Sequence, residues 1–229
     1  MQKNTQSRDL RTLAYVLKRT NYGEADRILN LITPEGKVSA IAKGARKEKS
    51  KLAGGIEMFS LIDVGLHFGK SEFAIVTSAK MVKYYSNILK DFARMEFAGV
   101  ALKKISLAAD SSDNPEFFKI VDQVLYELDG SLDLRIVRSW FVLHLFRAMG
   151  GEINLYRDKD GARLDEGTKY NWDSNQELFY ESLDGLYNSE DIKALRLMAM
   201  ADLKLVKKIR MSEAVVGQVA DFAQMFANI

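Results

Sequence analysis

The sequence contains no cysteine, and it has only two histidines and two prolines in 229 residues. The lack of cysteine excludes disulfide bonds, thiolate metal sites and cysteine nucleophiles, and it favours a cytoplasmic location. No apolar run approaches the roughly 20 residues that cross a bilayer, and the start of the chain lacks the hydrophobic stretch of a signal peptide. With 47% apolar residues, the chain can build one large core or two modest ones, so we expect a soluble globular protein.

Catalytic and metal-binding motifs are also scarce. There is no Walker loop, no G-x-G-x-x-G and no G-x-S-x-G, so nucleotide hydrolysis and acyl transfer have no support. The DKDG run at residues 158–161 places its glycine too early for a calcium loop and fits a hairpin tip instead. His144 falls in the most apolar stretch, which favours a core histidine, whereas His67 ends a predicted strand and could contact a base or a phosphate. We therefore expect a protein that is not an enzyme and needs no cofactor.

Positive charge is concentrated in one part of the chain. Residues 1–90 hold 16 Lys and Arg against 8 Asp and Glu, a net charge of +8, whereas residues 91–229 hold 17 against 23, a net charge of −6. The basic first part is therefore the candidate for binding a polyanion such as a nucleic acid.

The most cationic segment is AKGARKEKSK, at residues 42–51, with five cations, one anion and no apolar side chain larger than alanine. We expect a surface loop with no role in a core. Alternating polar and apolar residues predict a strand over 37–42, and another strand is predicted to begin near Ile56, so the loop is held at both ends. Each Lys or Arg that meets a phosphate releases condensed counterions, and Gly44 allows the backbone a close approach. The alternative is a solvated loop without a ligand.

Short motifs in this region occur in a characteristic order. They are YGEADRI at residues 22–28, TPEGK at 33–37 and AKGARK at 42–47, followed by Ser50, Leu52 and IEMF at 56–59. Together they resemble the amino-terminal OB-fold of the recombination mediator RecO family over about residues 10–80. A further run, FVLHLFRAMGGEINL at 141–155, resembles that family's helix that ends in a glycine turn before an irregular insertion.

The resemblance implies a function and partners. It implies a protein that binds single- and double-stranded DNA without sequence preference and anneals complementary strands. With RecR, such a protein helps RecA to replace single-strand-binding protein, whose acidic carboxyl-terminal tail docks on the helical domain. Many family members carry a four-cysteine zinc site in the insertion, and this sequence has no cysteine. We therefore predict a metal-free protein in which Tyr156, Trp172, Phe179 and Tyr180 pack together instead.

Strands are predicted in the first third of the chain and helices in the rest. The strand candidates are residues 11–18, 26–32, 37–42, 56–68 and 72–82, and the last two form a hairpin. Helical spacing of apolar residues predicts helices over about 88–109, 116–129, 134–149, 189–210 and 213–227, with an irregular insertion at 152–185. The predicted fold class is α+β, with a five-stranded OB-fold β-barrel over residues 1–82 followed by an all-α helical domain over residues 83–229.

Candidate DNA-binding residues are the cations and one aromatic residue of the predicted barrel: Lys18, Arg19, Tyr22, Arg27, Lys37, Lys43, Arg46, Lys47, Lys49 and Lys51. Arg135 and Arg138, beside Trp140 on a predicted helix, are candidates for binding the acidic tail. The cations of residues 204–210 are explained as complementing the dipole at a helix end. Two alternatives stay open: an RNA- or ribosome-binding OB protein, and a protein–protein adaptor whose basic loop meets an acidic partner.

Overall fold

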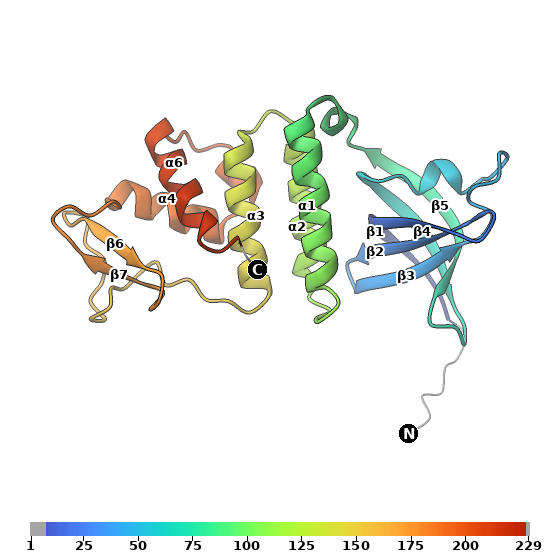
Figure 1. The fold of residues 1–229 in the computed structure, drawn as a ribbon, viewed down its shortest axis with the longest axis horizontal. Helices are drawn as coiled ribbons and strands as arrows, with labels where there is room; N and C mark the ends of the chain where they lie inside the picture. Colours follow the sequence, from blue (N-terminus) through green and yellow to red (C-terminus); the bar gives the residue numbers. More distant parts are fainter. Residues whose placement is uncertain (1–7, 228–229) are drawn as a thin grey trace, which may run out of the picture. The chain divides into compact units, whose positions relative to one another are not determined.

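The computed structural model describes residues 8–227, which form two compact units. The first unit ends at Gly130 and the second begins at Ser131. A β-barrel and a pair of helices make up the first unit, and helices with a small hairpin make up the second (Figure 1). Within the described residues, the helices are too short or too polar to cross a membrane.

A closed five-stranded barrel begins the first unit. Its strands are β1 (Arg8–Tyr22), β2 (Asp26–Thr33), β3 (Gly36–Ala42), β4 (Ser60–Phe68) and β5 (Ala74–Tyr84). The order around the barrel is β1-β2-β3-β5-β4, with β4 pairing back to β1. All neighbours are antiparallel except β3 and β5, which are parallel. This OB-like closure confirms the predicted fold class.

Alternate apolar side chains of the strands fill the barrel, among them Leu29, Leu31 and Val64, which are fully buried. Ile56 also belongs to this core, but it follows a short 3-10 helix, η1 (Ala53–Gly55), and is not the start of a strand. The predicted strand over 56–68 begins at Ser60 because Phe59 has a φ of 57°, a left-handed conformation that ends extended pairing.

The rest of the first unit is helical. It consists of the 3-10 helix η2 (Ser86–Lys90), α1 (Phe92–Ala108) and α2 (Glu116–Asp129). Asp91 caps α1 by accepting a hydrogen bond from the Arg94 amide at 3.1 Å. The predicted helix over 88–109 is therefore a 3-10 turn followed by an α-helix. Helix α1 packs against both α2 and β1.

The second unit contains α3 (Leu134–Ala148), a hairpin of β6 (Tyr170–Asp173) and β7 (Leu178–Glu181), α4 (Ser189–Met200), α5 (Leu203–Val206) and α6 (Glu213–Gln224). Helix α3 packs against α4 and α6. Trp140 on α3 is fully buried, as expected for the most apolar helix.

The prediction of a single helix over 189–210 is wrong. The chain leaves the helix at Ala201, where ψ is 154°, and the carbonyl of Ala201 accepts a hydrogen bond from Trp140 Nε1 at 2.7 Å instead of an intrahelical one. The four-residue helix α5 follows. Lys204 therefore lies within a single turn and Arg210 lies beyond it, so the long helix whose dipole these cations were expected to complement is absent.

Aromatic packing in the insertion is partly as predicted. The rings of Trp172 and Phe179 meet edge to face at 4.9 Å, and Phe179 is fully buried. Tyr156 is not in this cluster: it is 49% exposed, and the Arg196 guanidinium lies 4.8 Å from its ring centroid. Tyr180 follows Phe179 on β7, so the alternation of a strand turns it to the other face, where it is half-buried.

Candidate nucleic-acid interface

The cationic loop after β3 is fixed at its base by hydrogen bonds. Gly44 has a φ of +65°, and its amide donates to Asp26 Oδ1 at 2.7 Å. The Arg46 amide donates to the Ala25 carbonyl at 2.8 Å, and Arg46 Nη1 lies 3.3 Å from the Gly23 carbonyl. The left-handed φ explains why position 44 is a glycine. The three hydrogen bonds attach the loop to the turn between β1 and β2.

The expectation that this loop has no core role is wrong at one position. Ala45 is 1% exposed and belongs to the barrel core. Lys43, Arg46 and Lys47, on either side of it, are exposed. A buried alanine thus anchors a short stretch whose cations face solvent, which restricts where their charges can move.

Strand pairing brings further candidates to the same end of the barrel. Arg27 pairs with both Asn21 on β1 and Ala42 on β3, so it lies one residue from Lys43 in the sheet. Its Nε is buried and has no hydrogen-bond acceptor among the described residues, which leaves a donor unsatisfied. Tyr22, at the end of β1, is 54% exposed.

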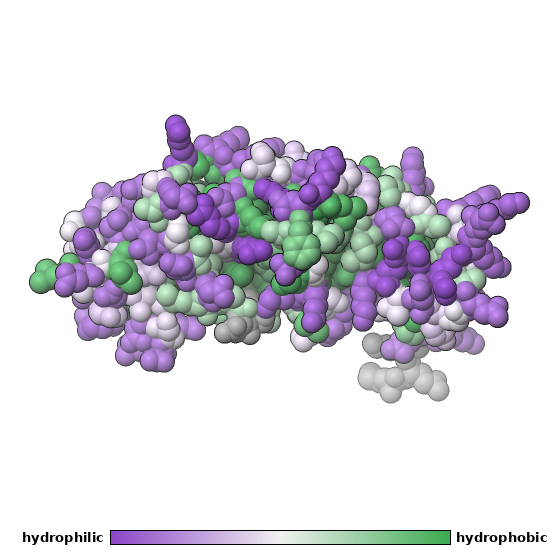
Figure 2. Space-filling view, turned by 45° about the horizontal axis from the view of Figure 1, so that its top comes forward, coloured by the Kyte–Doolittle hydropathy of each residue, from purple (hydrophilic) through white to green (hydrophobic). Residues whose placement is uncertain are grey.

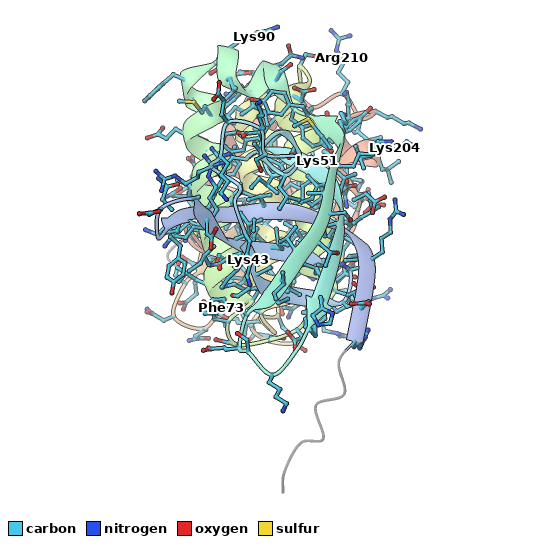
Figure 3. All side chains as sticks on the ribbon, turned by 90° about the vertical axis from the view of Figure 1, so that its right-hand side faces the viewer. Lys43, Lys51, Phe73, Lys90, Lys204 and Arg210 are labelled. Atoms are coloured by element: carbon cyan, nitrogen blue, oxygen red, sulfur yellow. The ribbon has the colours of Figure 1, made fainter. Side chains whose placement is uncertain are left out.

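Figure 3 looks onto the barrel and shows Lys43 and Lys51 on the side turned to the viewer. Lys49 and Lys51 are also exposed and continue the loop toward η1. In the space-filling view, hydrophilic side chains cover most of the visible face of the barrel (Figure 2). We call Tyr22, Arg27, Lys43, Arg46, Lys47, Lys49 and Lys51 the rim cluster.

The other three candidates lie elsewhere. Arg19 Nη1 is 2.7 Å from Glu57 Oε1, so a carboxylate already balances its charge. Lys37 Nζ contacts the Ser106 carbonyl at 2.8 Å and Asp110 Oδ1 at 2.6 Å, and its side chain is 10% exposed. Lys18 is exposed and pairs with Asn30, on the side of the barrel that α1 covers. The structure therefore does not bring these three residues into the rim cluster.

The two histidines have partners in the structure. His67 Nδ1 lies 2.6 Å from Asp9 Oδ1, near the end of the β1–β4 pair. His144 stacks on Trp140 with ring centroids 3.9 Å apart, and its Nε2 lies 3.1 Å from the Met198 carbonyl. His144 is therefore a partly buried histidine that packs on the core residue Trp140 and has a backbone partner. Among the described residues, no three His, Asp or Glu side chains are grouped so that they could hold a metal ion.

Arg135 is held by two carboxylates. Its Nη2 lies 2.6 Å from Asp133 Oδ2, and its Nη1 lies 2.6 Å from Glu213 Oε1. These hydrogen bonds raise the pKa of Arg135 above its ordinary value and lower the pKa of Glu213. An acidic peptide would have to displace these carboxylates to pair with Arg135. Arg138 is exposed, whereas Trp140 is fully buried and does not contribute to the surface.

Sequence reasoning missed the residues that fix the rim cluster. Asp26 and Ala25 were seen only as parts of a motif, although the Asp26 side chain holds Gly44 and the Ala25 carbonyl holds Arg46. A signal for this role was present, because an acidic residue in a short turn between strands is well placed to accept amide hydrogen bonds. Lys103, on α1, was also missed.

The structure is that of a protein with an OB-like barrel, a cationic loop at one end of the barrel and a mostly helical second part. Comparison with known proteins agrees with this architecture. The family model Recombination protein O N terminal matches residues 8–85, and Recombination protein O C terminal matches residues 97–227. The chain therefore belongs to the recombination protein O family.

Among curated relatives, a DNA repair protein RecO from Dehalococcoides mccartyi (strain ATCC BAA-2266 / KCTC 15142 / 195) is 33% identical over 151 residues, which cover 64% of this chain and 58% of the relative. The DNA repair protein RecO of Roseiflexus sp. (strain RS-1) is 32% identical over 160 residues, covering 69% of this chain and 56% of the relative. The chain thus spans less than two thirds of the length of the curated relatives it matches.

Proposed function

We propose that this protein is a non-enzymatic DNA repair and recombination mediator that binds single- and double-stranded DNA without sequence preference. It anneals complementary strands and, with RecR, assists the loading of RecA onto DNA covered by single-strand-binding protein. The observation that carries this proposal is the rim cluster, whose loop is fixed by the buried Ala45 and by the Gly44 amide while its lysines face solvent. Membership of the recombination protein O family supports it.

The chemistry of the rim cluster favours the phosphate backbone over base edges. Lysine and arginine contacts to phosphate carry no sequence information, so binding through them does not discriminate sequences. The Tyr22 ring, 54% exposed, adds a surface on which any base can stack. Both features suit a protein that handles DNA of arbitrary sequence.

Annealing follows from charge neutralisation. Two complementary strands repel each other through their phosphates, and a fixed cationic surface that accepts both forms of DNA reduces that repulsion. No cofactor is required for this step, because base pairing itself supplies the favourable free energy.

The reversal Lys43→Glu with Lys47→Glu tests the proposal. Arg46 is retained, because its guanidinium helps to hold the loop through Gly23. Single-strand affinity should fall by at least about tenfold, since two phosphate contacts become repulsive. Lys70→Glu is the matched control, because it reverses an exposed cation in the turn between β4 and β5. Equal affinity in the double variant and the control would overturn the role of the rim cluster.

Salt dependence tests the same contacts without mutation. If about five phosphates are bound, raising salt from roughly 50 to 200 mM should weaken single-strand binding about a hundredfold, at a logarithmic slope near 0.7 per contact. A flat response would be incompatible with a polyanion ligand.

Competition on one protein sample separates the proposal from its two alternatives. Labelled single-stranded DNA is displaced in turn by duplex DNA, by RNA of the same sequence and by an acidic peptide. DNA should compete best in both forms. Stronger competition by RNA would favour an RNA-binding OB protein, and competition by the peptide alone would favour an adaptor.

A further inference from the structure

A groove lies between the barrel and helix α1, within the first unit. Its volume is about 380 Å³, and it is lined by residues of β1, β2 and β3 on one wall and by residues of α1 and the turn after it on the other. Figure 1 shows α1 beside the barrel. The rim cluster does not contribute to this groove.

Lys37 fixes the distance between the two walls. Its Nζ, on β3, bonds to the Ser106 carbonyl of α1 at 2.8 Å and to Asp110 Oδ1 at 2.6 Å. Because Asp110 balances its charge, Lys37 has a positioning role and is not a free contact for a phosphate. Lys18 on the barrel wall and Lys103 on the helix wall are both exposed, and neither has an ion-pair partner among residues 8–227.

The barrel wall is irregular at this point. The register between β1 and β2 shifts between Val16 and Lys18, so Leu17 is an extra residue on β1. Such a bulge redirects the neighbouring side chains. Leu17 lines the groove, and Lys18 lies opposite Asn30, whose Oδ1 accepts from Ser39 Oγ at 3.4 Å. The Asn30 amide Nδ2 has no acceptor in the described chain, so it is available to a ligand.

The helix wall has an unusual glycine. Gly99 lies inside α1 with helical backbone angles, and a Cβ built on it would meet no atom within 4 Å. Glycine weakens a helix relative to alanine, and no atom of the described residues lies close enough to require it here. The missing side chain leaves the helix backbone open to the groove two turns from Leu107, which lines the same groove and is 61% exposed.

We infer that this groove binds one unpaired nucleotide of a DNA single strand. The phosphate lies between Lys18 and Lys103, the Asn30 amide donates to an oxygen of the nucleotide, and the sugar and base pack against Gly99 and Leu107. This inference rests on the proposed DNA binding by the rim cluster and extends it, because it continues the strand from the barrel onto α1. Charge complementarity and the apolar wall select a nucleotide over an isolated phosphate.

Two substitutions test the groove independently. Gly99→Leu adds a side chain to the groove at a position where a Cβ meets no described atom within 4 Å, and Lys103→Glu reverses one of the groove's cations. Each should weaken binding of a labelled oligothymidine by about threefold to tenfold, and Lys103→Gln should lower the salt slope by about 0.7, the value for one phosphate of a single strand. Duplex affinity should change less than twofold. Gly217→Leu in α6 is the control, because a Cβ there also meets nothing within 4 Å.

The outcomes separate the groove from the rim cluster. If Gly99→Leu and Lys103→Glu bind oligothymidine within twofold of the parent while Lys43→Glu with Lys47→Glu loses binding, the groove inference is overturned and the proposed function stands. If the rim double variant also binds normally, the proposed function itself fails. An equal loss for duplex and single strand, or saturation of the groove by inorganic phosphate alone in a competition titration, would also overturn an unpaired nucleotide as the ligand.

Discussion

Tyr15 joins the barrel to α2 through its hydroxyl group. The residue is fully buried on β1, its hydroxyl donates to Asp122 Oδ1, and the hydroxyl of Tyr85 lies 3.1 Å away. Burial is the largest cause that raises the pKa of Tyr15 above its ordinary value, followed by the hydrogen bond to Asp122. Tyr15 therefore donates a hydrogen bond from β1 to α2 as a neutral phenol near neutral pH.

Replacing Tyr15 by Phe should lower the free energy of unfolding by about 1.5–3 kcal/mol, because Asp122 loses a buried donor. Chemical denaturation would measure the loss. Tyr126→Phe is the control: Tyr126 is 54% exposed, so its change should stay within about 0.5 kcal/mol. Equal effects of the two substitutions would mean that the Tyr15 hydroxyl contributes nothing.

Glu213 gives a residue-scale prediction about pH. The hydrogen bond from Arg135 lowers its pKa below the ordinary value of 4.5. A carboxylate with a lowered pKa in the folded state stabilises the fold above its unfolded pKa and loses that contribution as pH falls through its folded pKa. The thermal midpoint of Glu213→Gln should therefore lie below that of the parent near neutral pH and converge with it in acid below 4.5.

Thermal melts of both proteins between about pH 7 and about pH 3 would measure this convergence. Glu181→Gln removes an exposed carboxylate at the end of β7 and serves as the control, with no expected dependence of this kind. A difference for Glu213→Gln that persisted unchanged in strong acid would contradict the role of the pair.

Sequence reasoning at this scale identified exposed cations better than it identified their partners. Lys43 and Lys47 were predicted to be exposed because the loop around them is polar, and they are. Lys37 was grouped with them, but Asp110, 73 positions away, holds it. Local sequence could not indicate that contact, because it forms only when α1 packs on the barrel.

At the scale of elements, the β6–β7 hairpin is held by aromatic rings. The ring centroids of Phe179 lie 4.9 Å from Trp172, 5.6 Å from Tyr187 and 6.0 Å from Phe222 of α6. The hairpin itself has only four residues in each strand. Two such short strands are marginal alone, so the contact with α6 supplies much of their stability.

Phe179→Ala should lower the free energy of unfolding by about 3–5 kcal/mol, the usual cost of a cavity left by a buried phenylalanine. Tyr156→Ala is the comparison, because Tyr156 is half exposed and loses mainly its contact with Arg196, for which about 0.5–1 kcal/mol is expected. Urea denaturation of both variants would measure the difference. A cost for Phe179→Ala no larger than that for Tyr156→Ala would contradict the ring cluster.

Element boundaries were predictable where local signals mark them and not elsewhere. The start of α2 was predicted from the run Asn114, Pro115 and Glu116, and the helix begins at Glu116. The break after α4 has no glycine or proline to mark it in the sequence. It coincides instead with the hydrogen bond from Trp140 to the Ala201 carbonyl, a contact between distant positions. Phe222, more than 40 positions from Phe179, joins its cluster through a similarly distant contact.

At the scale of the whole molecule, positive and negative charge are concentrated in different segments of the chain. Residues 1–90 have a net charge of +8, and residues 91–130, with 4 Lys and Arg against 8 Asp and Glu, have a net charge of −4. The acidic helix α2 and the acidic loop between α1 and α2 therefore belong to the same unit as the basic barrel, whereas α1 itself carries three cations against one anion. Asp110, which follows α1, balances the charge of Lys37 on the barrel. The lysines of the rim cluster are exposed and are not balanced in this way within the described residues, so positive charge is concentrated there.

The metal content of the protein gives a prediction for the molecule as a whole. Without cysteine, a zinc site would need histidines and carboxylates. His67 contacts Asp9 in the first unit, and His144 contacts the Met198 carbonyl in the second. Neither histidine lies in the insertion of residues 152–185, where burial of Phe179 and its contact with the half-buried Trp172 stabilise the hairpin instead.

The thermal midpoint should therefore be unchanged by a chelator such as EDTA, and the dialysed, tag-free protein should contain no stoichiometric zinc by elemental analysis. Phe179→Ala provides the matched comparison, because it should lower the midpoint equally with and without chelator if ring packing replaces the metal. About one equivalent of zinc in the protein, together with a midpoint that drops on chelation, would contradict this prediction, because a structural zinc site contributes directly to the free energy of folding.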